Sequence, residues 1–152
     1  MTAEPLDFDA ATLRPAPARR LVPVVVDAAQ VALEGGSDPA FGTVRWRTLI
    51  CGDRTGPGDM VLGVAEFEPG DRLEPHRHAP SEFYFGLSGE GMVTIEGTPH
   101  RIAPGVAIYI PGEAEHGVEA GAFGLSFAYG FARGRFAEVD YRFSATPQRV
   151  GD

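Results

Sequence analysis

GDRLEPHRHAPSEFYFGLSG, residues 70–89, brings two histidines and a glutamate into one short run bounded by glycines. His76 and His78 are separated by one residue, so on a strand both imidazoles point to the same face and Arg77 points to the other. Glu82 follows at the start of an aromatic-rich segment. We therefore expect the two histidines to face the interior of the fold, with the glutamate nearby.

A second run, GVAIYIPGEAEH at residues 105–116, ends in His116 shortly after a Pro-Gly turn. Three imidazoles and a carboxylate suit Mn²⁺, Fe²⁺, Co²⁺, Ni²⁺ or Zn²⁺, and a metal that prefers five or six ligands keeps positions open for water or substrate. The alternative for any single histidine on a strand is a surface residue or a hydrogen-bonded core residue. The residue types alone leave both interpretations open.

Outside these runs, many short apolar segments are separated by glycine and proline turns. They recur at a spacing of roughly 8–12 residues with almost no helical periodicity, which indicates an antiparallel barrel or sandwich. The expected strands cover residues 21–26, 44–50, 60–67, 81–87, 92–96, 100–103, 106–110, 123–131 and 139–143, with one turn of helix in residues 27–33.

The length of 152 residues fits one domain. Residues 1–20 contain prolines and alanines without apolar periodicity, so we expect a flexible N-terminal arm there. The barrel is expected to span residues 21–145, followed by a C-terminal tail at residues 146–152.

Composition excludes several classes of function. The net charge of −8 argues against nucleic acid and anionic membranes as partners. The sequence contains no lysine, which excludes Schiff-base chemistry and a phosphate-binding P-loop. Cys51 is the only cysteine, and no secretory signal or apolar membrane span is recognisable. A cytoplasmic location is therefore expected.

The spacings Gly70-x5-His76-x-His78-x3-Glu82-x6-Gly89 and Gly105-x5-Pro111-x4-His116 resemble the two motifs of the cupin superfamily. The second motif departs at Glu113, where a glycine is common, and at Ala120, where an asparagine is common. The resemblance implies a single all-β jelly-roll barrel, with one divalent transition-metal ion (Fe, Mn, Ni, Co or Zn) held by His76, His78, Glu82 and His116. Many cupins are homodimers, and residues 22–26 are the candidate edge strand for such pairing.

The ligand pattern, with Tyr84 two residues after the glutamate, is similar to that of small cupins that cleave dimethylsulfoniopropionate to dimethyl sulfide and acrylate. This resemblance implies a small-molecule substrate whose carboxylate binds the metal and a catalytic role for Tyr84 as the base that removes an α-proton. The alternative for Tyr84 is a core tyrosine on an aromatic strand. Aromatic residues that would face the sulfonium cation are Trp46, Tyr109, Tyr129 and Tyr141.

Two other functions are compatible with the same ligand set. The first is an Fe²⁺ dioxygenase, in which O₂ and an organic substrate occupy neighbouring open positions on the metal. The second is a cupin that binds a small molecule without turnover. Because cupins of all three kinds share this ligand pattern, the sequence leaves the reaction open.

Overall fold

Strands form nearly all of the regular structure in the computed structural model, which describes residues 22–55 and 58–144. The predicted arm (1–20) and tail (146–152) lie outside the described residues. The strands are β1 (Glu34–Gly35), β2 (Arg45–Ile50), β3 (Val61–Phe67), β4 (Arg72–Arg77), β5 (Glu82–Ile95), β6 (Thr98–Ile102), β7 (Ala107–Ile110), β8 (His116–Phe131) and β9 (Arg142–Phe143). In the described part of the chain the helices are two short 3₁₀ turns, η2 (Ala28–Gln30) and η3 (Phe136–Glu138).

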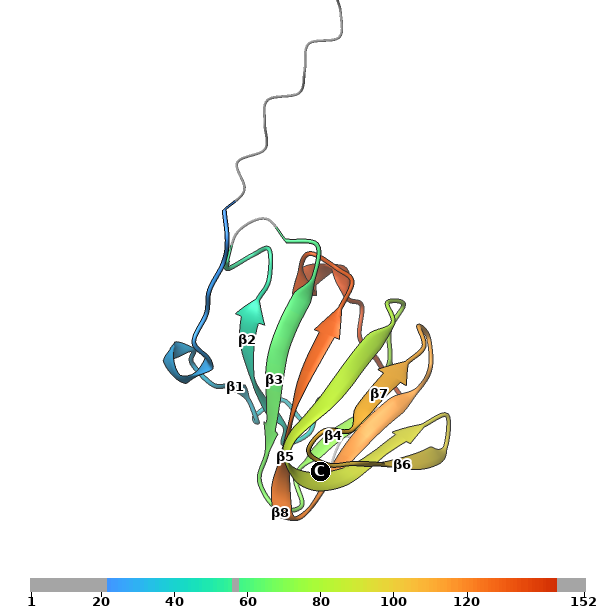
Figure 1. Ribbon diagram of the computed structural model, residues 1–152. Helices are drawn as coiled ribbons and strands as arrows, with labels where there is room; N and C mark the ends of the chain where they lie inside the picture. The colour runs from blue at the N-terminus through green and yellow to red at the C-terminus, as the bar shows by residue number, and fades with distance from the viewer. Residues whose placement is uncertain (1–21, 56–57, 145–152) are drawn as a thin grey trace, which may run out of the picture.

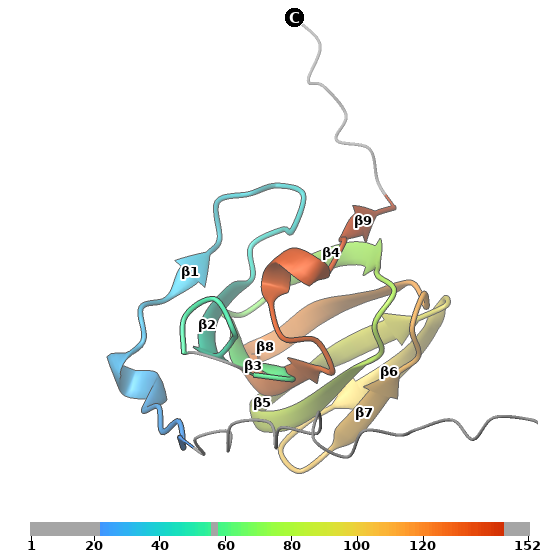
Figure 2. The same cartoon turned by 90° about the horizontal axis from the view of Figure 1, so that it is seen from above.

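The strands pair in an antiparallel manner within one nine-stranded sheet. Its main path runs β1-β2-β3-β8-β4-β9, and β5 pairs with β6, β7 and β8. Figures 1 and 2 show the sheet curling around an interior as a half-open barrel. The predicted all-β barrel is therefore confirmed. Within the described residues, the structure contains no helix with the length and apolar character needed to cross a membrane.

β5 bends where the sequence predicted a turn between two strands. The register of β5 against β8 shifts between Gly89 and Gly91, which marks a bulge. Gly89 has a φ of +64°, and a Cβ there would lie 2.1 Å from the carbonyl oxygen of Gly124. The glycines therefore allow a sharp bend within a continuous ladder, and the predicted strands 81–87 and 92–96 are one strand. Because β5 and β8 also pair beyond this bulge, β8 begins at His116, well before the predicted start at residue 123.

The inward face of β3 illustrates how the barrel builds its core. Its burial alternates along the strand, with Val61, Ala65 and Phe67 buried, as expected for a strand with one face toward the interior. Phe67 packs against Phe127 of β8 at a ring centroid distance of 5.5 Å. This packing joins the inward faces of β3 and β8 in the core.

The prediction of a strand at residues 21–26 is wrong over its described part. Residues 22–27 form no strand, and Val25 is 94% exposed. Pro23 has no N–H to donate, and no other described strand pairs with this segment, so nothing compensates the lost hydrogen bonds. The predicted helical turn is reduced to η2, capped by the Asp27 side chain, which accepts a hydrogen bond from the backbone N–H of Ala29. The predicted strand 139–143 is likewise reduced to β9, after η3.

Candidate metal centre and its cavity

The candidate metal ligands lie where three strands begin or end. His76 is in β4, His78 follows the end of that strand, and Glu82 and His116 are the first residues of β5 and β8. All four side chains are buried, and one possible ligand atom from each lies within 4.8 Å of the others. The structure therefore brings together the four residues that the sequence singled out.

Each of the three imidazoles is oriented by a main-chain carbonyl two residues away. The Nδ1 atoms lie 2.8, 2.8 and 2.9 Å from the carbonyl oxygens of Glu74 for His76, Pro80 for His78 and Ala114 for His116. A carbonyl oxygen only accepts, so each Nδ1 carries a proton and donates it. The Nε2 atom of a neutral ring then has a free lone pair, which is the form in which imidazole binds a metal.

The Glu82 carboxylate contacts two of the three imidazoles. Its Oε2 atom lies 3.2 Å from Nε2 of His78 and 3.1 Å from Nε2 of His116. Both Nδ1 atoms already carry protons, so a hydrogen bond from each Nε2 to Glu82 would require two imidazolium ions. One divalent cation supplies the same two positive charges. Two ligand atoms at right angles around a metal at about 2.1 Å lie about 3.0 Å apart. The donor types, charge and spacing therefore fit a divalent transition-metal ion.

The protonation equilibria of the cluster are shifted by burial and by mutual contact. Burial, reinforced by the charge of His116, lowers the pKa of His76 to about 4. Burial also opposes protonation of His78, but hydrogen bonding to the Glu82 carboxylate outweighs it and raises the pKa of this imidazole. Burial by itself would raise the pKa of Glu82, yet its contacts with His116 and His78 lower it. The carboxylate therefore stays charged, as a ligand for a cation must.

Glu113 explains one departure from the cupin motif. Its φ of +67° is in the left-handed region that glycine adopts most easily, and its N–H donates to the carbonyl oxygen of His78 at 2.8 Å. Its carboxylate pairs with Arg142, and Glu115 accepts from Arg77 at 3.4 Å. Both carboxylates therefore bond arginines rather than the ligand histidines.

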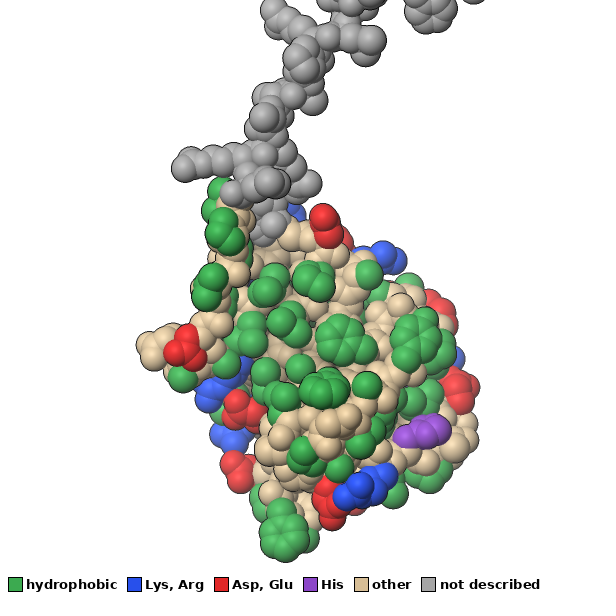
Figure 3. Space-filling model, viewed as in Figure 1, with side chains coloured by type: hydrophobic (Ala, Val, Ile, Leu, Met, Phe, Trp, Pro, Cys, Tyr) green, Lys and Arg blue, Asp and Glu red, His purple; other side chains and the backbone are tan. Residues whose placement is uncertain are grey.

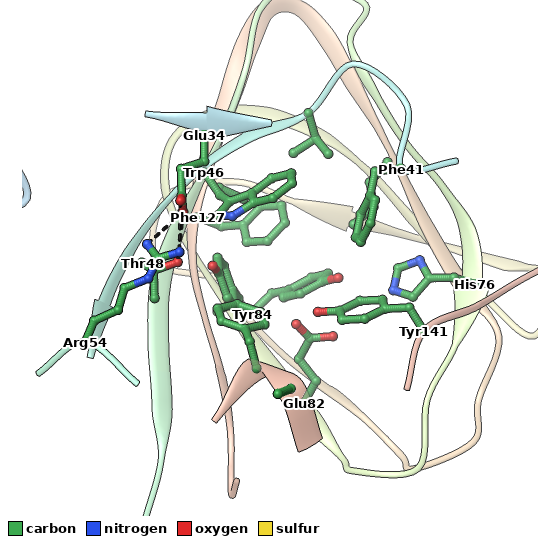
Figure 4. A pocket seen from close by; sticks show the side chains of 16 residues that line it. Glu34, Phe41, Trp46, Thr48, Arg54, His76, Glu82, Tyr84, Phe127 and Tyr141 are labelled. Carbon is green, nitrogen blue, oxygen red and sulfur yellow. Dashed lines mark hydrogen bonds and ion pairs between the residues drawn. The ribbon is translucent and has the colours of Figure 1, made fainter. Parts of the chain in front are cut away.

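A cavity of about 440 Å³ opens beside the cluster. His76 and Glu82 form part of its wall, and Figure 4 shows their side chains directed into it. Three of the four predicted substrate-pocket residues, Trp46, Tyr129 and Tyr141, also line it. The remaining wall consists of Glu34, Phe41, Val44, Thr48, Arg54, Ala65, Leu73, Tyr84, Phe127, Phe136 and Ala137.

Tyr84 and Tyr141 place two phenols beside the metal cluster. Tyr84 is 1% exposed, and its ring centroid lies 6.2 Å from that of His116. Burial, with the nearby charge of Glu82, raises the pKa of Tyr84 well above its usual value, and burial does the same for Tyr141. The ring of Tyr141 lies 5.3 Å from that of His76, and its hydroxyl points toward Glu82 (Figure 4). Both tyrosines also line the cavity beside the candidate metal ligands.

The prediction that Tyr109 belongs to the substrate pocket is wrong. Tyr109 is 69% exposed and does not line the cavity. In the antiparallel pairing of β5 with β7 it lies opposite Phe83, whereas the cavity residues Glu82 and Tyr84 lie opposite Ile110 and Ile108. Side chains alternate between the two faces of a strand, so Tyr109 points outward.

Sequence reasoning missed the polar part of the cavity wall. Glu34 and Arg54 form a bidentate ion pair, with both nitrogen–oxygen distances at 2.9 Å, and the Thr48 hydroxyl donates to Glu34 at 3.4 Å. Phe41 was also missed, although its ring packs against Trp46 and Tyr141. Phe41 and Arg54 lie in loops, and Glu34 and Thr48 lie in β1 and β2, all outside both motifs. Their contacts depend on the folding of the whole sheet. The sequence carried no local signal for them.

The fold, the ligand cluster and the cavity agree with the comparisons to known proteins. The family model for the cupin domain matches residues 63–122, which include all four candidate ligands. The chain belongs to the cupin family.

Within that family, the chain is 60% identical over 124 residues to the dimethylsulfoniopropionate lyase DddW of Ruegeria pomeroyi, covering 82% of each sequence. Among solved structures, the polyketide cyclase RemF of Streptomyces resistomycificus superposes with a TM-score of 0.71 at 22% identity, covering 84% of this chain and 89% of that one. A structure of the dimethylsulfoniopropionate lyases RdDddP and RnDddQII gives a TM-score of 0.63 at 19% identity, covering 76% of this chain and 63% of the other. At these identities the structural matches establish the fold alone.

Proposed function

We propose that this chain is a metal-dependent lyase that cleaves dimethylsulfoniopropionate into dimethyl sulfide and acrylate. The observation that carries the proposal is that two members of the four-residue cluster, His76 and Glu82, line one cavity together with a buried phenol, Tyr84. The 60% identity to a dimethylsulfoniopropionate lyase over most of both chains supports the same substrate.

The reaction needs a base near the carbon next to the substrate carboxylate. A divalent ion held by the three histidines and Glu82 would supply positive charge that polarises the substrate carboxylate and lowers the pKa of the nearby Tyr84 phenol. The phenolate oxygen of Tyr84 then takes the α-proton, and the electron pair of that C–H bond forms the carbon–carbon double bond. The Cβ–S bond breaks with its electrons on sulfur, which leaves as neutral dimethyl sulfide.

The aromatic wall suits the cationic end of this substrate. Trp46, Tyr129 and Tyr141 line the cavity, and their faces carry the negative electrostatic potential that attracts a cation. Tyr129 is 6% exposed, so such a contact is formed away from bulk water. This wall would hold the sulfonium until the Cβ–S bond breaks, after which the neutral sulfide loses that attraction and departs.

The activity is tested on purified protein reconstituted separately with Fe²⁺, Mn²⁺ and Zn²⁺. Dimethyl sulfide is measured by gas chromatography of the headspace and acrylate by nuclear magnetic resonance, under argon and under air. Equal formation of both products without O₂ is expected. Turnover only with Fe²⁺ and consumption of O₂ would favour the dioxygenase instead. Binding of dimethylsulfoniopropionate with no product under any condition would favour a cupin that only binds.

The homodimer stays a prediction, and one surface supports it. Phe83, Phe85 and Leu87 point outward from β5 and are 41–46% exposed, beside Tyr109 of β7. Figure 3 shows apolar side chains gathered on this face of the molecule. A contiguous exposed apolar surface of this kind commonly marks a contact between proteins. Sedimentation equilibrium should give the mass of two chains, with Phe85→Glu shifting it toward one; a wild-type monomer would contradict the dimer.

The cytoplasmic location also stays a prediction. Cys51 is free and buried, so the described fold does not depend on a disulfide. The protein therefore suits a reducing compartment, which fractionation of the source cells would test directly.

A further inference from the structure

β9 and the residue before it bring two aromatic rings to the candidate metal ligands. β9 has only 2 residues, lies at an edge of the sheet and pairs with β4 alone among the described strands (Figure 2). The ring of Tyr141, the residue before β9, lies 5.3 Å from the rings of both His76 and His78, and the ring of Phe143 lies 5.6 Å from that of His76. A short edge strand has few ladder hydrogen bonds and opens more easily than the core strands. Its closed position therefore depends on further contacts.

Burial alternates along this segment. Tyr141 and Phe143 are partly buried, whereas Arg142 and Ser144 are exposed. Successive side chains of an extended segment point to opposite faces, so the two exposed residues face away from the histidines and can bond a neighbouring loop. The N–H of Ser144 also donates to the carbonyl oxygen of Pro75 at 3.0 Å, which continues the pairing with β4 by one residue.

The loop before β8 bonds these outward side chains at two points. The Arg142 guanidinium pairs with the Glu113 carboxylate, and the Ser144 hydroxyl donates to the Glu115 carboxylate. This loop leads directly into His116, the first residue of β8. The loop that ends at one candidate ligand is therefore also the loop that bonds β9.

The backbone of Glu113 points to a role of its side chain beyond the turn. Its φ of +67° is in the left-handed region, where a side chain costs free energy that glycine avoids. The turn uses the main-chain N–H of Glu113, which donates to the carbonyl oxygen of His78, and glycine has the same N–H. What a glycine would lack is the carboxylate that pairs with Arg142.

The pair of Glu113 with Arg142 is suited to shift a local equilibrium rather than to stabilise the whole fold. The two side chains are 54% and 49% exposed, and ion pairs this exposed add little to the free energy of unfolding. Opening of β9 alone, however, breaks far fewer contacts than unfolding does. The same small contribution is therefore a larger share of what keeps this strand closed.

We propose that Glu113 is a positioning residue: through Arg142 it holds β9 against β4 and thereby keeps Tyr141 in the substrate cavity. Tyr141 lines this cavity, and Figure 4 shows its hydroxyl directed toward Glu82. The inference rests on the proposed function, in which Tyr141 contacts the cationic end of the substrate. It adds that this contact is positioned from outside the cavity by an exposed carboxylate. Because Tyr141 takes no proton in that reaction, its displacement weakens substrate binding more than the chemical step.

The kinetic test removes either partner of the ion pair. Glu113→Gly and Arg142→Ala should each raise KM for dimethylsulfoniopropionate about two- to fivefold, the range in which one exposed ion pair shifts an equilibrium, with little change in kcat or metal content. The double variant should be no worse than either single variant, and Arg142→Lys, which keeps the charge, should be close to wild type. Glu113→Gly also relieves backbone strain, so loss of folding does not explain a higher KM. An unchanged KM in both single variants would overturn the proposal.

Arg101→Ala is the matched control for the loss of an exposed ion pair. It breaks the pair of Arg101 with Glu90, which joins β6 to β5 outside the cavity, and it should leave KM unchanged. A second comparison asks whether the effect passes through Tyr141. In a Tyr141→Leu background the substrate contact is already absent, so adding Glu113→Gly should not change KM further. A further rise of the same size would reject Tyr141 as the residue that Glu113 positions.

Hydrogen exchange tests the positioning without turnover. The Ser144 amide, followed by nuclear magnetic resonance on Zn²⁺-loaded protein, should exchange about two- to fivefold faster in Glu113→Gly and Arg142→Ala, whereas the amides of β3 should exchange at the wild-type rate. Calorimetry with the ammonium counterpart of dimethylsulfoniopropionate, which has a poor leaving group, should show a loss of affinity of the same size. If the wild-type protein did not cleave dimethylsulfoniopropionate, the proposed function would fail, while faster exchange of Ser144 would still support the role of Glu113. Unchanged exchange in both variants would reject that role whether or not the protein is a lyase.

Discussion

His76 of β4 and His116 of β8 are direct cross-strand partners, and their ring centroids lie 4.3 Å apart. The register of this strand pair shifts between Leu73 and His76, so the histidines face each other only because of an irregularity in the ladder. This pair therefore places the first motif, which contains His76, next to the second motif, which contains His116. The candidate metal site depends on this pairing as well as on the four candidate ligands themselves.

Replacement of His116 by alanine tests this dependence. His116→Ala removes one of four ligands while leaving the β4–β8 ladder in place, so metal affinity should fall at least about 10–100-fold. Metal content after dialysis, measured by plasma mass spectrometry, should drop from near one ion per chain to a small fraction. Circular dichroism should keep its β-sheet spectrum. His100→Ala, on the surface strand β6, is the matched control and should retain the metal. Full metal content in His116→Ala would exclude this residue as a ligand.

The depressed pKa of His76 predicts how the stability of metal-free protein varies with pH. In the unfolded chain the His76 imidazole binds a proton near pH 6.5, whereas in the folded chain it does so only at about pH 4. His76 therefore contributes fully to the free energy of unfolding above pH 6.5. This contribution is lost as pH falls toward 4, by about 3 kcal/mol at most. The lowered pKa values of Glu34, Glu82 and Glu115 change the free energy of unfolding only below about pH 4.5. The raised pKa of His78 changes it only above about pH 6.5.

Urea unfolding of chelator-treated protein between pH 4.5 and 6.5 therefore isolates His76. The free energy of unfolding should increase with pH across this window. His76→Gln, which cannot titrate, should give a nearly flat profile. A slope of the same size in this variant would show that another group is responsible.

Removal of the Tyr84 hydroxyl separates metal binding from proton transfer. Tyr84→Phe keeps the aromatic ring that packs against Phe127 at a centroid distance of 4.1 Å, so the fold and metal content should persist. If the phenolate is the base, kcat should fall by about 10²–10⁴-fold, with dimethyl sulfide release as the measurement. Tyr109→Phe serves as the control outside the cavity. Unchanged kcat in Tyr84→Phe would assign the proton transfer to another group.

The backbone of Glu113 predicts a stabilising substitution. A residue with a side chain at φ +67° is strained by about 1 kcal/mol relative to glycine. Glu113→Gly relieves this strain and loses only a half-exposed ion pair with Arg142, which contributes little. Its free energy of unfolding should exceed that of Glu113→Ala by about 1 kcal/mol in urea titrations. If the two variants are equally stable, the left-handed conformation carries no cost at this turn.

The extent to which the sequence foretold the structure differs between the ligands and the cavity. His76, His78 and Glu82 are predictable because strand alternation and a short loop place them together regardless of the rest of the fold. The contact of Glu34 with Arg54 is not predictable, because it joins two segments through the pairing of β1, β2 and β3.

Two errors have identifiable physical causes. Tyr109 was assigned to the pocket for its aromatic ring, although strand alternation with the buried Ile110 already places it on the outer face. The strand expected at residues 21–26 has β-branched side chains but no described neighbouring strand to pair with it. For Tyr109, the alternation of side chains along β7 was overlooked. For residues 21–26, tertiary context outweighed the local preference for a strand.

The main-chain acceptors of the three ligand imidazoles have a consequence for how such a protein diverges. Glu74, Pro80 and Ala114 contribute their carbonyl oxygens, which every amino acid possesses, and not their side chains. Mutations at these three positions therefore preserve ring orientation as long as the backbone path is kept. Residues of the cavity wall can then change by mutation while the candidate ligands remain aligned. New substrates can therefore be acquired in small mutational steps, each of which leaves a working protein.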